Sequence, residues 1–230
     1  MTAPRPVLLV HGWAGSFAHT WERSGVVELL REAGRTVVAY DLPGHGSATK
    51  PHDPTQYADL AGHLLAHVEQ HGSLSVDAVG FSLGAITLLR AVSRTPDAFG
   101  TVILAGIGDG VFSPHDPSRS ERILAGLEGR AEPGDVTARI FGKIGNEAHN
   151  DVRALAAVLR RPREEPLTHE SLAAITNPVI VALGDQDFSG PATRLSAALP
   201  NARLVTLKGI DHFRTPESFD FIDLVVNTFS

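Results

Sequence analysis

The stretch Gly80-Phe81-Ser82-Leu83-Gly84 joins an apolar run at residues 75–79 to an amphipathic segment at residues 83–95. The first pattern predicts a buried strand and the second a helix, so the serine lies on a sharp strand-to-helix turn. Flanking glycines let strand and helix approach without Cβ clashes. We therefore expect Ser82 to be a nucleophile at the amino end of a helix, where free amides favour negative charge. The alternative is a tight turn with an N-capping serine.

Short apolar runs rich in Val, Ile and Leu recur along the chain, at residues 7–10, 36–40, 75–79, 101–105, 179–183 and 203–207. Continuous runs of this kind are typical of strands that are buried on both faces of a parallel sheet. Amphipathic segments alternate with them, at residues 21–33, 55–71, 83–95, 192–199 and 217–229. The alternation predicts an α/β fold with a mostly parallel, doubly wound sheet.

One long interval interrupts this alternation, between the runs that end at Ala105 and begin at Val179. It is too long for a bare loop in a compact domain, and it holds three helix-like pieces, at residues 119–127, 136–144 and 150–159. We expect residues 107–166 to form a helical insertion over the carboxyl edge of the sheet, and residues 1–106 and 167–230 to form the core. The alternative is a set of ordinary crossover helices.

Composition excludes several classes of protein. The net charge is −6 and no basic tract is present, which argues against a nucleic-acid partner. The chain has no cysteine, so disulfides, thiolate metal sites and a cysteine nucleophile are excluded. The sequence shows no bilayer-length apolar run and no secretory-signal pattern, so we expect a soluble cytoplasmic protein without a membrane partner. His63 and His67 lack the glutamate of a zinc-binding motif, so we expect no metal site.

A serine nucleophile needs a general base and a carboxylate that orients it. His212 follows the last apolar run, so we expect it at the same sheet edge as Ser82. Asp185 and Asp187 follow the run at residues 179–183, and Asp109 follows the run at residues 101–105. Spacing alone leaves all three aspartates open.

An oxyanion hole is also required, built from two backbone amides that face the reacting carbonyl oxygen. One is expected to be the amide of Leu83, directly after the nucleophile. The other is expected from Trp13, in the loop after the first strand, where Gly12 permits an unusual backbone.

These motifs resemble those of the α/β-hydrolase superfamily. In chain order they are the oxyanion loop at residues 11–13, the D-x-P-G-x-G loop at 41–46, the nucleophile elbow at 80–84, the acid loop at 184–187 and the histidine loop at 211–213. The resemblance implies that Asp187 is the acid of a Ser82-Asp187-His212 triad, and that the insertion is a lid. Because the chain has no room before Val7 for the family's first two strands, we expect about six strands.

The resemblance implies a hydrolase that acts on a small molecule and needs no cofactor. A serine nucleophile points to acyl transfer, so we expect a carboxylesterase-type enzyme for a small or medium ester, lactone or thioester. We predict a small apolar pocket with five phenylalanines as candidate wall residues: Phe81, Phe112, Phe141, Phe188 and Phe213.

Two other functions remain open. A carbon–carbon bond hydrolase or a lyase would use the same triad on acidic substrates, and an arginine facing the pocket would distinguish it. The predicted insertion offers six arginines for this role: Arg119, Arg122, Arg139, Arg153, Arg160 and Arg161. A ligand-binding receptor that kept the fold is the second alternative.

Overall fold

A six-stranded parallel sheet runs through the computed structural model, which describes residues 4–72, 75–114 and 116–230. The strand order is β2-β1-β3-β4-β5-β6, and every neighbouring pair is parallel. The strands are β1 (Val7–Val10), β2 (Val37–Tyr40), β3 (Val76–Phe81), β4 (Phe99–Ala105), β5 (Val179–Gly184) and β6 (Ala202–Leu207). All six predicted strands are confirmed. Residues 1–3, 73–74 and 115, which the predicted core and insertion include, lie outside the described residues.

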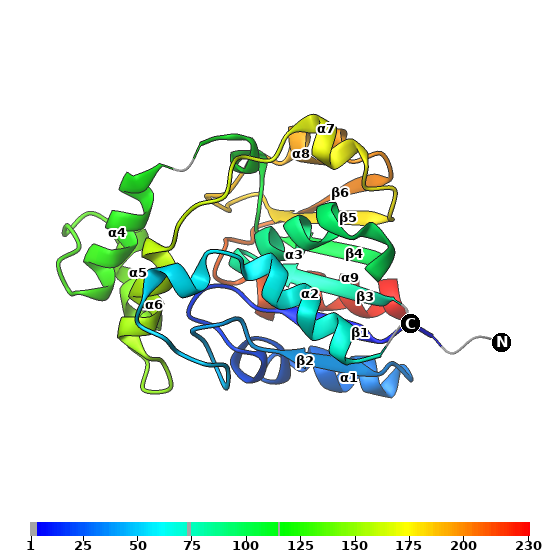
Figure 1. The fold of residues 1–230 in the computed structure, drawn as a ribbon, viewed down its shortest axis with the longest axis horizontal. Helices are drawn as coiled ribbons and strands as arrows, with labels where there is room; N and C mark the ends of the chain where they lie inside the picture. The colour runs from blue at the N-terminus through cyan, green and yellow to red at the C-terminus, as the bar shows by residue number, and fades with distance from the viewer. Residues whose placement is uncertain (1–3, 73–74, 115) are drawn as a thin grey trace.

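Helices cover both faces of the sheet (Figure 1). α1 (Val26–Glu32) and α9 (Phe219–Phe229) pack on one face, and α2 (Leu60–Gln70), α3 (Leu83–Arg94), α7 (His169–Ala173) and α8 (Thr193–Ala198) pack on the other. Alternate strand residues serve the two layers, as in β1, where Val7 and Leu9 face α1 and α9 while Leu8 and Val10 face the opposite layer. The doubly wound arrangement explains why these strands are apolar throughout.

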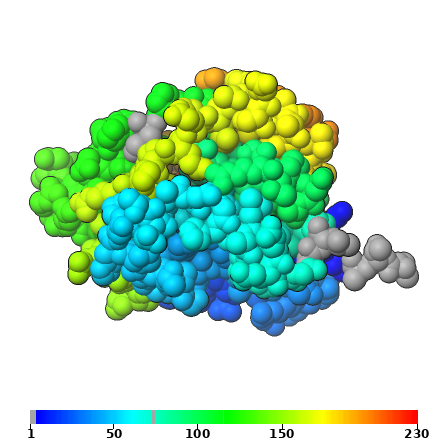
Figure 2. Space-filling model, viewed as in Figure 1, coloured from blue at the N-terminus to red at the C-terminus, as the bar shows by residue number. Residues whose placement is uncertain are grey.

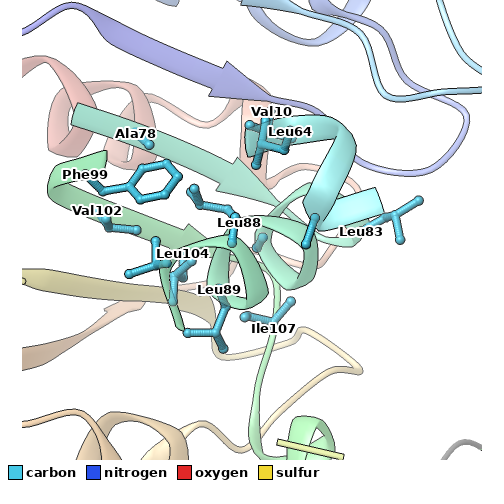
Figure 3. Packing of buried hydrophobic residues seen from close by; sticks show 14 of the residues in the cluster. Val10, Leu64, Ala78, Leu83, Leu88, Leu89, Phe99, Val102, Leu104 and Ile107 are labelled. Atoms are coloured by element: carbon cyan, nitrogen blue, oxygen red, sulfur yellow. The ribbon is translucent and has the colours of Figure 1, made fainter. Parts of the chain in front are cut away.

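Helix α3 packs against the middle of the sheet and thereby fixes the position of Ser82. Leu88 and Leu89 point from α3 toward β3 and β4, where Ala78, Val102 and Leu104 meet them (Figure 3). All five side chains are almost fully buried, so the helix that begins directly after Ser82 is held by close apolar packing.

Several predicted helices differ from the observed ones. The predicted helix at residues 21–33 is divided in two. Its first residues belong to a π-helical turn (Phe17–Glu22) and the rest form α1, with Gly25 between them at a φ of 84°. Residues 55–71 form a 3-10 turn (Pro54–Tyr57) followed by α2, whose first turn is capped by the side chain of Asp59. Further 3-10 turns are Pro96–Ala98, Asp109–Phe112 and Thr215–Glu217, and the short helix α7 had no sequence signal strong enough to predict it.

Three helices lie beyond the carboxyl ends of the strands: α4 (Pro117–Leu127), α5 (Val136–Gly145) and α6 (Val152–Arg160). We call Pro117–Arg160 the α4–α6 segment; it protrudes at the left of the body in Figures 1 and 2. An aspartate caps the amino end of each helix. The segment has a small hydrophobic cluster of its own, in which Leu124, Leu127 and Leu155 pack against Ala14 of the body.

Candidate active site

Ser82 occupies a strained turn between β3 and α3. Its φ of 53° and ψ of −116° lie in a region that residues with a side chain rarely adopt. The turn is possible because Gly84 and Gly80 have no side chain. A Cβ at Gly84 would lie only 2.4 Å from the carbonyl oxygen of Val10, and one at Gly80 only 2.7 Å from Cα of Ala85. The predicted strand-to-helix turn is therefore present, with the serine side chain held at the carboxyl edge of the sheet.

His212 follows β6 and reaches Ser82 across the sheet edge. Its Nε2 lies 3.0 Å from Oγ of Ser82, although the two residues are 130 positions apart in the chain. The imidazole is only 3% exposed. This distance is within hydrogen-bond reach, so His212 is placed to accept the hydroxyl proton.

Asp187 follows β5 and holds the other side of the imidazole. Its two carboxylate oxygens lie 3.0 and 2.9 Å from Nδ1 of His212. Nδ1 therefore donates to the carboxylate, which leaves Nε2 free to accept from Ser82. Burial alone raises the pKa of Asp187, but the hydrogen bond and charge of His212, with further hydrogen bonds from Ser189, lower it overall. The carboxylate is thus favoured in its ionised form.

The two rival aspartates have other partners. Asp109 accepts a hydrogen bond from the amide of Leu195 at 2.9 Å, in the first turn of α8. Asp185 accepts from the amide of Gly209 at 2.8 Å, in the loop before His212. The geometry brings Asp187 to the imidazole and leaves these two carboxylates in structural roles.

A loop after β1 lies directly beside Ser82. A Cβ at Gly12 would be 3.2 Å from Cβ of Ser82. Nε2 of His11 accepts from the amide of Leu42 at 3.1 Å, so its Nδ1 carries the proton and donates to the Gly12 carbonyl at 2.7 Å. Burial lowers the pKa of His11, which agrees with a neutral ring.

The orientation of the Gly12 carbonyl decides where the next amide points. In a planar trans peptide the C=O and the following N–H point in opposite directions. The Gly12 carbonyl is held by His11 and by the amide of Gly15 at 3.1 Å, so the Trp13 N–H points away from these partners. Leu83 is the first residue of α3, so its amide has no carbonyl one helical turn earlier that could accept its hydrogen bond. Within the described residues, neither amide has an acceptor.

Three phenylalanine rings lie close to the imidazole of His212. The ring centroid of Phe188 lies 4.3 Å from that of His212, and the ring of Phe81 lies 5.0 Å from it. Phe213 and Phe141 are 5.0 Å apart, and both lie near Phe188. Four of the five phenylalanines expected at the pocket are thus close together around the imidazole.

Phe112 lies elsewhere. Its ring stacks on His169 at 4.7 Å, and the guanidinium of Arg194 lies 5.1 Å from its centroid. It packs against the core, beside His169 of α7, a helix that the sequence did not predict.

The described residues contain no group of three or more His, Asp or Glu side chains that could hold a metal ion. In the same part of the chain, no helix has the length and apolar character needed to cross a membrane.

A family model described as the alpha/beta hydrolase family matches residues 7–221. The chain belongs to the alpha/beta hydrolase family. Solved structures agree on the fold of this chain: an esterase from Exiguobacterium antarcticum superposes with a TM-score of 0.78, at 18% identity, over 100% of this chain and 93% of that chain. A 2-hydroxy-6-oxo-6-phenylhexa-2,4-dienoate hydrolase from Rhodococcus superposes with a TM-score of 0.73, at 22% identity, over 98% of this chain and 90% of that chain.

Curated relatives of this chain include two kinds of enzyme. An esterase of Mycobacterium tuberculosis is 31% identical over 157 residues, which cover 67% of this chain and 50% of the esterase. The match therefore spans about half of that relative's length. A 2-hydroxy-6-oxononadienedioate/2-hydroxy-6-oxononatrienedioate hydrolase of Pseudomonas putida is 28% identical over 235 residues, covering 90% of this chain and 81% of the relative.

Three residues near the candidate site had no local sequence signal. Ser189 donates its amide to Asp187 at 2.7 Å, and its hydroxyl lies 3.4 Å from Nδ1 of His212. Asn150 donates to the carbonyl of Ala14 at 3.2 Å, in the loop beside Ser82. The guanidinium of Arg119 lies 5.3 Å from the centroid of Phe188. Of these, the sequence suggested only Arg119, as one of six arginines that could face the pocket.

Proposed function

We propose that this protein is a serine hydrolase that cleaves a small or medium carboxylic ester, lactone or thioester through an acyl-enzyme on Ser82. The observation that carries the proposal is the chain of hydrogen bonds from Ser82 to His212 to Asp187, with distances of 3.0 and 2.9 Å. Nucleophile, base and orienting carboxylate stand in the order that acyl transfer requires.

In the proposed reaction, Nε2 of His212 takes the Ser82 hydroxyl proton as Oγ attacks the carbonyl carbon. The carbonyl oxygen becomes negative and is stabilised by the amides of Trp13 and Leu83. When the tetrahedral intermediate collapses, His212 gives the proton to the leaving alcohol or thiol. Water then attacks the acyl-enzyme with His212 again as base, which releases the acid and restores Ser82.

Residues 107–166 are proposed to act as a lid. Support comes from the α4–α6 segment, which lies beyond the carboxyl ends of the strands (Figure 1), and from Phe141 of α5, which contacts Phe188 and Phe213 near His212. A cover of this kind excludes water from the reacting groups, and this strengthens their electrostatic interactions.

The test is turnover of 4-nitrophenyl acetate and butyrate by the wild-type protein and by Ser82→Ala, together with labelling by a fluorophosphonate probe. We expect Ser82→Ala to lose labelling and to lower kcat by about 10⁴-fold or more, because the nucleophile is removed. Turnover and labelling that persist in Ser82→Ala would refute the proposal.

A second candidate function is hydrolysis of a carbon–carbon bond in an acidic substrate. Two observations favour it: the Pseudomonas putida relative aligns over 90% of this chain, and Arg119 lies over Phe188 beside His212. A 2-hydroxy-6-oxodienedioate, the kind of compound named for that relative, is the substrate to test. Its turnover by a protein that is labelled at Ser82 but leaves every ester intact would favour this candidate.

A further inference from the structure

Trp13 connects the site to the α4–α6 segment. Its backbone amide belongs to the loop beside Ser82, but its partly buried side chain contacts α5 and α6. The indole Nε1 donates to the carbonyl of Leu155 in α6 at 3.2 Å. The ring packs edge-to-face on Phe141 at 5.7 Å, and a Cβ at Gly145 would lie 3.2 Å from Cη2 of the ring. A shift of these helices would therefore pull directly on Trp13.

The next residue, Ala14, is held by the same segment in a conformation that costs energy. Its φ is 61°, which is unfavourable for a residue with a Cβ. Its carbonyl accepts from Nδ2 of Asn150 at 3.2 Å, and the same amide group donates to Ile144 at 3.0 Å. Because both acceptors are carbonyl oxygens, the NH2 side of Asn150 must face them. Ala14 is only 1% exposed, so no solvent replaces this contact.

Residues of the body hold the loop at the Gly12 carbonyl and again at Ser16, which bonds to His19. His11 and Gly15 fix the carbonyl of Gly12. Between these points, two groups of the loop bond to the α4–α6 segment. The Trp13 indole donates to the Leu155 carbonyl, and the Ala14 carbonyl accepts from Asn150. The Ala14 C=O and the Gly15 N–H belong to one peptide plane, so the contact with Asn150 bears on the Gly15 amide that holds the Gly12 carbonyl. The orientation of that carbonyl sets the direction of the Trp13 N–H.

We propose that the α4–α6 segment completes the oxyanion hole, with Asn150 and the Trp13 indole as the positioning residues that transmit its position to the Trp13 amide. When the segment is seated, the strained Ala14 is held and the amide faces the reacting carbonyl oxygen. When the segment moves away to admit substrate, Ala14 relaxes and the hole loses one donor. Acyl transfer is thereby restricted to the closed enzyme. This inference rests on the proposed serine hydrolase function.

The experiment compares Asn150→Ala with Asn146→Ala. Both asparagines donate to backbone carbonyls, but Asn146 has its acceptors, Leu127 and Gly142, within the α4–α6 segment. We expect Asn150→Ala to lower kcat for 4-nitrophenyl butyrate by about 10-fold or more with little change in KM, since loss of an oxyanion donor acts mainly on the transition state. Its affinity for a trifluoromethyl ketone of the same acyl chain, which forms a tetrahedral adduct, should fall in parallel.

Trp13→Phe removes the indole donor but keeps an aromatic ring, and it gives a second route to the same result if Asn150→Ala fails to fold. Wild-type kcat and ketone affinity in both variants would overturn the inference, and so would an equal loss in Asn146→Ala. Ser82→Ala separates this result from the proposed function. If Ser82→Ala is inactive while Asn150→Ala and Trp13→Phe are normal, only the present inference fails. If Ser82→Ala retains full activity, the proposed function itself fails.

Discussion

The body of the protein and the α4–α6 segment are built in different ways. In the body, Ser82, Asp187 and His212 follow β3, β5 and β6, so their positions are set by a parallel sheet with helices packed on both faces. Most apolar residues of the α4–α6 segment pack in a small separate cluster, and only Ala157 and Val158 of α6 join the main core. The segment reaches the site through contacts from Asn150, Phe141 and Arg119 and through the Leu155 carbonyl, which accepts from Trp13.

This difference assigns separate tasks to the two regions. Groups that exchange a proton must be held to within a fraction of an ångström, and a close-packed sheet provides that precision. Groups that admit and select a substrate must be able to move, and a segment that packs mostly in a small separate cluster permits motion. We therefore expect substitutions in the body to abolish the reaction, and substitutions in the segment to change its rate or its preference for substrates.

The largest expected effect in the body beyond Ser82 concerns the aspartate. Asp187→Asn should lower kcat by about 10³-fold or more, because an amide at this position favours the wrong tautomer of His212. Ester turnover at saturating substrate is the measurement. Asp109→Asn and Asp185→Asn are the matched controls, and each should keep most of its activity since Leu195 and Gly209 are their partners. Loss of activity in Asp109→Asn alone would transfer the role to that residue.

A smaller effect is expected on stability as the pH falls. Burial, and then the nearby His11, lower the pKa of His45 to about 3. In the unfolded chain a histidine has a pKa of about 6.5. Below that pH, His45 therefore binds a proton in the unfolded state but not in the folded state. The stabilisation is complete above pH 6.5 and is lost as the pH decreases. Between pH 7 and pH 5, His45 should contribute a loss of about 2 kcal/mol in the free energy of unfolding.

Urea unfolding at both pH values measures this loss. In His45→Asn the pH-dependent part should shrink by about 2 kcal/mol, whereas His63→Gln, at an exposed position, should leave it unchanged. An unaltered pH dependence in His45→Asn would mean that the buried imidazole is not the source.

The smallest effect is expected at Arg119 and affects only substrate preference. Arg119→Gln should lower kcat/KM for mono-4-nitrophenyl glutarate by about 5-fold, because an exposed ion pair contributes at most about 1 kcal/mol. For the neutral 4-nitrophenyl pentanoate the value should not change. Arg153→Gln removes an equal charge from α6 and should leave both values as they are. Equal losses for the two esters in Arg119→Gln would exclude a role in recognising acidic substrates.

Much of this architecture could be predicted from short stretches of sequence. The six strands and the Ser82 turn were predicted because apolar runs and flanking glycines act locally. Asp187 was one of three open aspartates until its family motif was considered, since spacing places each of them at a strand end. The helix at residues 21–33 was predicted as continuous because the φ of Gly25 depends on how the chain turns there.

The sequence by itself determined the order of the elements and the residues that stand at the carboxyl edge of the sheet, because strand and turn preferences depend on neighbours in the chain. Only the tertiary structure decided which distant groups meet there. Asn150 and Ala14 are 136 positions apart, and Ser82 and His212 are 130 apart. Such pairs form through the packing of whole helices and strands, so no local pattern encodes whether Asn150 bonds to the loop after β1 or Arg119 lies over Phe188.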